Sequence, residues 1–113
     1  MSNKFKIEKS VANKALNVTL IGRIEIPDAE SFIETYNKET SGINTKDYTL
    51  NFDCTKMSVT PPGPLLKGCF EMYKKDGFKK VLINIEKNQV VLGMQFKRLA
   101  KECGLSVLEV NTL

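Results

Sequence analysis

The sequence predicts an α/β fold, built as one domain around a mixed β-sheet. Three observations carry this prediction. Segments with apolar residues at every second position alternate with segments of helical spacing, an almost unbroken apolar run fills residues 81–85, and 113 residues leave room for one hydrophobic core. The expected order is β-β-α-β-α-β-α-β, a hairpin followed by parallel strands, and the domain is expected to cover residues 1–113.

The first half of the chain predicts a β-hairpin, a helix and a strand. Apolar and polar residues alternate over residues 5–8 and again over 16–20, and we expect the second strand to continue to Pro27. Asp28 is expected to cap a helix that ends before Gly42. Alternation over residues 48–52 predicts the next strand. The apolar face of the helix is expected to contain Ala29, Phe32, Ile33 and Tyr36.

The second half predicts two helices, each followed by a strand. One helix is expected from Pro64 to Gly77, and the run at 81–85 predicts a central, parallel strand that is buried on both faces. The last helix is expected to start after Asn88 and to stop at Gly104, before a short strand at 107–110. The apolar faces of the two helices are expected to contain Leu65, Leu66, Cys69, Phe70 and Tyr73, and Leu92, Phe96, Leu99, Ala100 and Cys103.

Composition excludes several functional classes. The chain has no histidine, which removes Ser-His and Cys-His pairs and the commonest transition-metal ligand. Its three cysteines form neither a zinc pair nor an evident disulfide framework, which favours a reducing cytoplasm. No apolar run approaches the roughly 20 residues that span a bilayer, so we expect a soluble, cytoplasmic protein without membrane insertion. We expect no catalytic residues, no metal and no cofactor.

The charge pattern argues against nucleic acid as a partner. The net charge is +4, but only two of the 17 basic residues are arginines, which is few for base or phosphate recognition. Basic side chains on the last helix and around the strand at 81–85 are interpreted as solvated surface, with an acidic partner surface as the alternative. These residues are Lys97, Arg98 and Lys101, and Lys74, Lys75, Lys79 and Lys80.

Three further patterns have simple structural interpretations. Gly63 and Gly68 have the glycine spacing of a phosphate-binding P-loop, but Cys69 and Phe70 stand where its lysine and hydroxyl residue are needed. The carboxylates Glu25, Asp28, Glu30 and Glu34 surround a helix start, where negative charge is favourable. Cys69 and Cys103 are interpreted as core residues, whereas Cys54 is expected to be the more exposed thiol.

The remaining candidate site is the loop before the second helix. It contains Ser58, Thr60, Pro61, Pro62 and Gly63. A loop between the carboxyl end of a strand and the start of a helix is where open α/β sheets usually place their sites, and free N–H groups at a helix start suit an anion. The prolines are equally consistent with a rigid turn that has no site.

Several segments over roughly residues 4–110 follow one another in a distinctive order and spacing. They are an N-terminal hairpin, the stretch Val18–Glu25, which is similar to a V-x-L-x-G-x-L-D strand, the helix with Ala29 and Phe32, and the segments Leu50–Asp53, Phe96–Leu105 and Val107–Val110. Together they resemble a STAS domain, the fold of bacterial anti-sigma factor antagonists. Such proteins carry a D-S-S-G or D-S-[ST]-G loop before the second helix, and its second hydroxyl residue is phosphorylated by a kinase that is also the anti-sigma factor. Here the loop is Thr60-Pro61-Pro62-Gly63, and only the glycine matches.

The resemblance implies a non-catalytic regulatory module that binds a protein, either an anti-sigma-type kinase or another STAS-containing assembly. Because Pro62 has no hydroxyl, the usual phosphorylation cannot occur at this position, and we expect a form that is not switched there. The alternative is a module that binds a nucleotide or lipid-like ligand between the sheet and the second helix. An enzyme that uses Cys54 is a third hypothesis.

Overall fold

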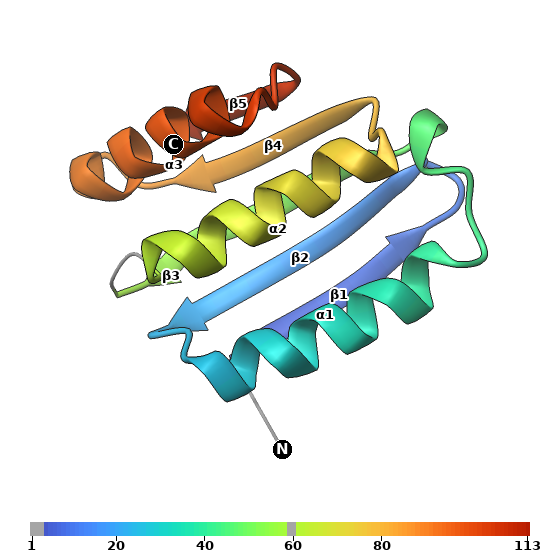
Figure 1. Ribbon diagram of the computed structural model, residues 1–113, viewed down its shortest axis with the longest axis horizontal. Helices are drawn as coiled ribbons and strands as arrows, with labels where there is room; N and C mark the ends of the chain where they lie inside the picture. The colour runs from blue at the N-terminus through green and yellow to red at the C-terminus, as the bar shows by residue number, and fades with distance from the viewer. Residues whose placement is uncertain (1–3, 59–60) are drawn as a thin grey trace.

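The computed structural model describes residues 4–58 and 61–113 and has the expected α/β fold (Figure 1). Its strands are β1 (Phe5–Ser10), β2 (Ala15–Gly22), β3 (Thr49–Met57), β4 (Lys80–Ile85) and β5 (Leu108–Thr112). Its helices are α1 (Ile26–Thr40), α2 (Gly63–Asp76) and α3 (Val90–Cys103), with a short 3₁₀ turn, η1 (Thr45–Asp47), before β3. The predicted order of strands and helices is confirmed.

The five strands lie in the sheet in the same order as in the chain. The β1–β2 pair is antiparallel, and β2 to β5 are parallel, as expected for a hairpin followed by βαβ units. Each crossover moves one position along the sheet, and right-handed crossovers of this kind place every helix on the same side. Figure 1 shows α1, α2 and α3 side by side on one face.

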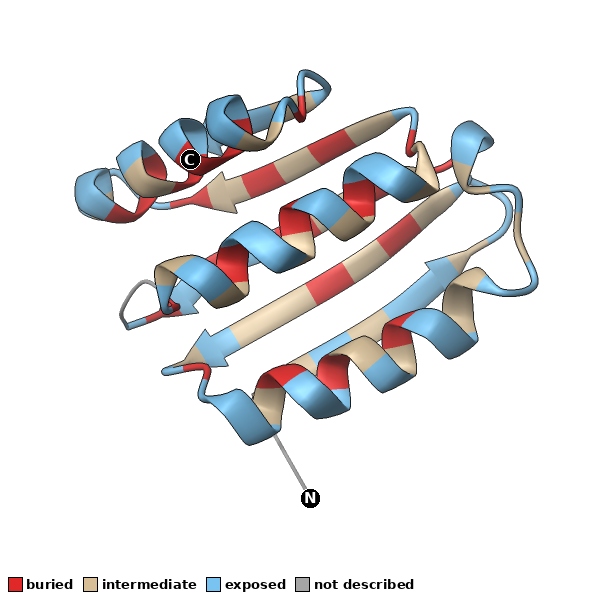
Figure 2. Cartoon of the chain, in the orientation of Figure 1, coloured by how far each residue is buried: buried red, intermediate tan, exposed pale blue. Residues whose placement is uncertain are grey.

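The hydrophobic core lies between the sheet and the three helices. Residues that point towards the helices are buried, and their neighbours along each strand are more exposed (Figure 2). Aromatic rings connect the layers: Phe52 of β3 lies 6.4 Å from Phe32 of α1 and 5.5 Å from Tyr73 of α2, between ring centroids. Phe70 and Phe96 join α2 to α3 at 6.2 Å.

The opposite face of the sheet carries a row of hydrogen-bonded asparagines. Asn111 donates to Asn84 at 3.0 Å, Asn84 to Asn51 at 2.9 Å, and Asn51 to Asn17 at 3.1 Å. This row crosses β5, β4, β3 and β2. The prediction that β4 is buried on both faces is therefore wrong. Within β4 only Val81, Ile83 and Ile85 are buried, because α1, α2 and α3 cover the face of the sheet opposite the asparagine row.

The helix ends partly confirm the predicted boundaries. Gly77 and Gly104 have a φ of 72° and end α2 and α3 in the left-handed conformation that glycine adopts without strain. The start of α1 differs from the prediction: β2 ends at Gly22, and Ile26 is already helical. Asp28 is not the N-cap. It lies within the first turn, where its Oδ2 accepts the N–H of Glu25 at 2.9 Å.

Candidate functional site

The candidate loop lies at the edge of the sheet where the parallel strands end and all three helices begin, here called the carboxyl edge (Figure 1). Ser58 is exposed, and its N–H donates to the carbonyl of Gly22 at 3.0 Å. Pro61 is buried, Pro62 is exposed, and Gly63 opens α2. Thr60, the remaining predicted site residue, lies outside the described residues. The structure thus confirms the place of the loop in the fold but tests no function for it.

Gln89, which no sequence pattern marks as a candidate, joins the start of α3 to the end of β3. Its Nε2 donates to the carbonyls of Cys54 at 3.0 Å and Met57 at 3.1 Å, and its Oε1 accepts the N–H of Glu86 at 2.7 Å. These carbonyls are accessible because the pairing of β3 with β4 ends at Asp53, whereas β3 continues to Met57. The side chain therefore fixes the chain immediately before Ser58 to the chain immediately before Val90.

Large exposed hydrophobic side chains gather at the carboxyl edge. Val91 is 76% exposed and Met94 is 65% exposed, both in the first turns of α3. In the described part of the chain only Val11 and Val107 are exposed large hydrophobics at the opposite end. The exposed hydrophobic residues of the carboxyl edge are Ile21, Ile26, Val90, Val91, Met94 and Leu113. Apolar side chains that gather on one side of a small protein commonly mark an interaction site.

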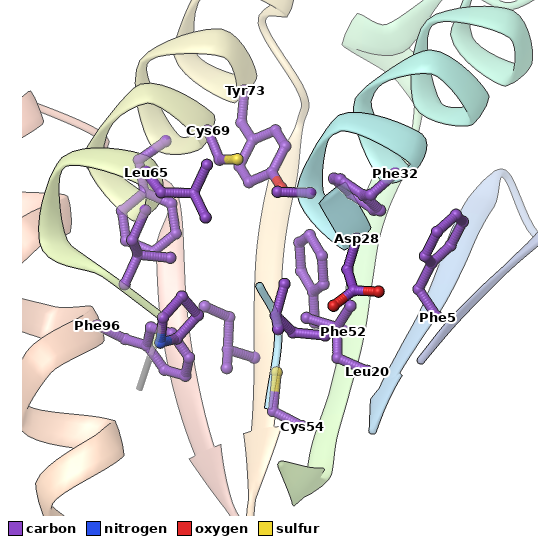
Figure 3. Close-up of a pocket in the computed structure, with 16 residues that line it drawn as sticks. Phe5, Leu20, Asp28, Phe32, Phe52, Cys54, Leu65, Cys69, Tyr73 and Phe96 are labelled. Carbon is purple, nitrogen blue, oxygen red and sulfur yellow. The ribbon is translucent and has the colours of Figure 1, made fainter. Parts of the chain in front are cut away.

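An apolar cavity of about 60 Å³ lies beneath the starts of α1 and α2 (Figure 3). The sheet contributes Leu20, Phe52 and Cys54, and the helices contribute Phe32 and Leu65, among other side chains. Asp28 lies at its margin, where its carboxylate forms an ion pair with the Lys4 ammonium at 3.2 Å. Pockets for drug-sized ligands usually measure about 300–1,000 Å³, so the cavity in this conformation is too small for a nucleotide.

The expectation that Cys54 is the most exposed thiol is wrong. Cys54 is 1% exposed because it points from β3 into the core, whereas Cys69 and Cys103 are partly exposed at the core margin. Burial, with a smaller contribution from the charge of Asp53, raises the pKa of the Cys54 thiol to about 12. A thiol in this environment stays protonated at neutral pH and is a weak nucleophile.

The charged candidate residues are mostly exposed to solvent, as expected from their positions in the sequence. Glu25 and Glu30 are exposed at the start of α1, and Glu34 is exposed near its middle rather than at the helix start. Residues 4–58 and 61–113 contain no group of three side chains arranged to hold a metal ion. Lys97, Arg98 and Lys101 are exposed on α3, where Arg98 pairs with Glu102 at 3.9 Å. Lys80 pairs with Glu109 at 3.3 Å across β4 and β5.

Comparison with known proteins adds no assignment. No protein-family model matches the chain, and a search of curated proteins returns no match. The resemblance to STAS domains stays a prediction. Within the described part of the chain, no helix is long and apolar enough to cross a membrane.

Proposed function

We propose that the chain is a non-catalytic regulatory module that binds a protein partner through the carboxyl edge. The observation that carries this proposal is the gathering of exposed apolar side chains there, at the start of α3 and on both sides of the candidate loop. Their removal from water by a partner would favour association at roughly 25 cal/mol per Å² of apolar area, before the costs of association are counted.

The loop and the start of α3 are parts of one surface. Gln89 bonds to the carbonyl of Met57, the residue directly before Ser58, and is itself followed directly by Val90 and Val91. A partner that covers Val91 and Met94 would therefore lie next to the loop. This arrangement supports a combined contact of the loop with α3.

The resemblance to anti-sigma factor antagonists supports an anti-sigma-type kinase, or another STAS-containing assembly, as the partner. Pro62 occupies the N-cap position of α2 with φ −52° and ψ 137°. A hydroxyl residue here would lie at a helix N-terminus, a favourable place for a phosphate, but proline has no hydroxyl to modify. Partner binding by the proposed module is therefore not switched by phosphorylation at position 62.

Affinity capture from the cell of origin tests the proposal, with four baits compared in parallel. The wild-type chain and Val11→Asp should retain the same partner, because Val11 is 68% exposed at the opposite end of the sheet. The double variant Val91→Asp with Met94→Asp should lose it, since it places two charges in the apolar contact. Pro62→Ser should become phosphorylated and release the partner.

Two results would contradict the proposal. Equal retention of the same partner by the wild type and by the Val91→Asp, Met94→Asp double variant would exclude the carboxyl edge as the contact. Phosphate on Ser58 or Thr60 in protein purified from its native cell would contradict the constitutive form. Circular dichroism of each bait shows that its fold is intact before binding is compared.

The apolar cavity favours a second candidate function, the binding of a small ligand between the sheet and α2. Its lining suits a short apolar group rather than a nucleotide, and the starts of α1 and α2 would have to separate to admit an acyl chain. A ligand that binds only the folded form must raise the melting temperature. A melting temperature unchanged by saturating fatty acids of increasing length would exclude this function.

A further inference from the structure

The free edge of β5 is a second surface to which a partner could bind. β5 is the last strand of the sheet. The carbonyl of Val107 accepts the N–H of Val81 at 3.1 Å, and the N–H of Leu113 donates to the carbonyl of Ile85 at 2.9 Å. The backbone groups of every second residue from Val107 to Leu113 therefore point towards β4. The backbone groups of Val110 and Thr112 therefore point away from the sheet, as in any parallel edge strand.

The two edges of the sheet differ in how well they are protected against strand addition. β1 carries the charged residues Lys6, Glu8 and Lys9, and the side chain of Lys6 is 69% exposed. Charged residues, and lysine above all, discourage another strand from pairing with an edge. β5 contains one charged residue, Glu109, and charges on both strands are ion-paired, Lys6 with Glu8 at 3.6 Å and Glu109 with Lys80 at 3.3 Å, so the two edges differ in the number of charged residues. The β5 edge is therefore the more permissive edge.

A groove of about 340 Å³ lies between α3 and the turn that leads into β5. Its apolar floor includes Ala100, Leu105 and Leu108. Lys97, Lys101 and Ser106 supply its polar groups, and neither lysine forms an ion pair with another residue of the described part of the chain. The groove therefore offers apolar contact together with two positive charges on the helix-covered side of the β5 edge.

We propose that the β5 edge and this groove bind an extended, acidic segment of a partner protein. The segment would pair with the outward backbone groups of Val110 and Thr112 as an added strand, a common mode of peptide recognition. Alternate side chains of an added strand point to the same face, so one face of the segment would meet the groove. An apolar side chain there would contact Leu105 and Leu108, and carboxylates would meet Lys97 and Lys101.

This surface is separate from the carboxyl edge, and its test does not depend on the proposed function. The probe is a capped hexapeptide, Leu-Thr-Glu-Thr-Glu-Thr, titrated into the labelled full chain while amide chemical shifts are recorded. A second peptide carries lysine in place of both glutamates. Two further versions of the acidic peptide are N-methylated at every second residue, one at the odd positions and one at the even positions. Because alternate backbone N–H groups point to opposite edges of a strand, only one of these versions loses the donors that pair with β5.

We expect the acidic peptide to shift the amide signals of Val110 and Thr112 and to slow the hydrogen exchange of both. The lysine peptide should bind at least about tenfold more weakly. One N-methylated peptide should lose binding while the other retains it. The double variant Lys97→Glu with Lys101→Glu should weaken the acidic peptide at least about tenfold, whereas Lys75→Glu with Lys79→Glu, exposed residues outside the groove, should leave its affinity within about twofold.

Four results would overturn the inference. The first is that millimolar acidic peptide causes no saturable change in the amide chemical shifts, and the second is that the two N-methylated peptides bind equally well. The third is that the acidic and basic peptides bind equally well, and the fourth is that the control double variant loses as much affinity as Lys97→Glu with Lys101→Glu. If instead the Val110 and Thr112 signals change on dilution of the protein alone, a second copy of the chain occupies the edge, and the acidic partner is excluded as its occupant.

Discussion

The Tyr36 hydroxyl donates a 2.5 Å hydrogen bond to Oδ2 of Asp76 and so joins the C-terminal half of α1 to the last residue of α2. Tyr36 is fully buried, and its ring lies 5.6 Å from that of Tyr73. An acidic residue at a helix C-terminus is unfavourable for the helix dipole, so the bond compensates a local electrostatic cost. It also holds α1 and α2 together at the end opposite the carboxyl edge.

Tyr36→Phe is expected to lower the free energy of unfolding by about 1–2 kcal/mol, because the half-buried carboxylate of Asp76 loses its donor. Urea denaturation measures the change. Tyr48→Phe is the matched control, since Tyr48 is also buried but its hydroxyl makes no hydrogen bond within the described part of the chain. Equal losses in the two variants would show that the bond contributes nothing.

Stability is expected to fall at alkaline pH because of the buried thiol of Cys54. Its pKa is raised by burial from 9.0 to about 12, so the folded state holds this proton more tightly than the unfolded chain. The resulting contribution is complete below about pH 9 and is lost progressively as the pH rises towards 12. Burial and the bond to Asp76 also raise the pKa of Tyr36, which adds a loss in the same direction above about pH 10.

Cys54→Ala should make this alkaline decline shallower, although the variant is less stable at neutral pH because it leaves a small cavity. The measurement is the free energy of unfolding by urea at intervals between pH 7 and 10.5. A slope identical to that of the wild type would mean that Cys54 does not contribute.

Replacement of Gln89 tests the link between β3 and α3. Gln89→Glu places a carboxylate against the carbonyls of Cys54 and Met57, so at neutral pH it should be less stable than Gln89→Ala. Repulsion by the carbonyls raises the pKa of the new carboxyl, and its protonation restores a donor. The penalty of Gln89→Glu relative to Gln89→Ala should therefore diminish as the pH falls below about 5.

Thermal unfolding of the two Gln89 variants at pH 7 and pH 4.5 provides the comparison. Hydrogen exchange at Ser58, whose N–H is bonded to Gly22, should accelerate in both variants because the preceding chain is less restrained. An unchanged exchange rate would show that Gln89 does not position the loop.

Gly93 lies where α3 closely approaches the side chain of Ile85 in the sheet. A Cβ at this position would lie 2.7 Å from Cδ1 of Ile85, so Gly93→Ala should cost about 1–3 kcal/mol. Ile85→Val removes that methyl group, and the double variant should recover part of the loss. Gly68→Ala is the control: it lies in α2 with open space around it and should stabilise by about 0.5–1 kcal/mol. Strict additivity of the two core substitutions would contradict this contact.

Most of the fold was predictable because local patterns determine it. Apolar alternation located β1 to β3, and glycines correctly marked the ends of α2 and α3. Two errors came from information that is not local. The run at 81–85 shows that β4 is apolar but not that one face lacks helices, and Ile24 and Ile26 suit a strand although Gly22, with a φ of 70°, already ends it.

The candidate site was only partly predictable. The proline-rich loop is visible from its composition, and its place before α2 follows from the element order. The role of Gln89 depends on contacts with Met57 and Cys54, which lie 32 and 35 positions earlier in the chain, so no spacing rule could reveal it. The burial of Cys54 was missed because the polar residues around it suggested a strand end, whereas β3 continues to Met57.

The asparagine row also specifies how the strands align. Side chains alternate between the two faces of a strand, so a slip of β3 by one residue would turn Asn51 towards the helices and bring Leu50 and Phe52 to water. Asn17 and Asn84 would lose their amide partner in the same step. On the face of the sheet away from the helices, where the hydrophobic core does not determine strand alignment, the asparagine row makes a shifted register unfavourable. The four parallel strands therefore have one favoured register on both faces.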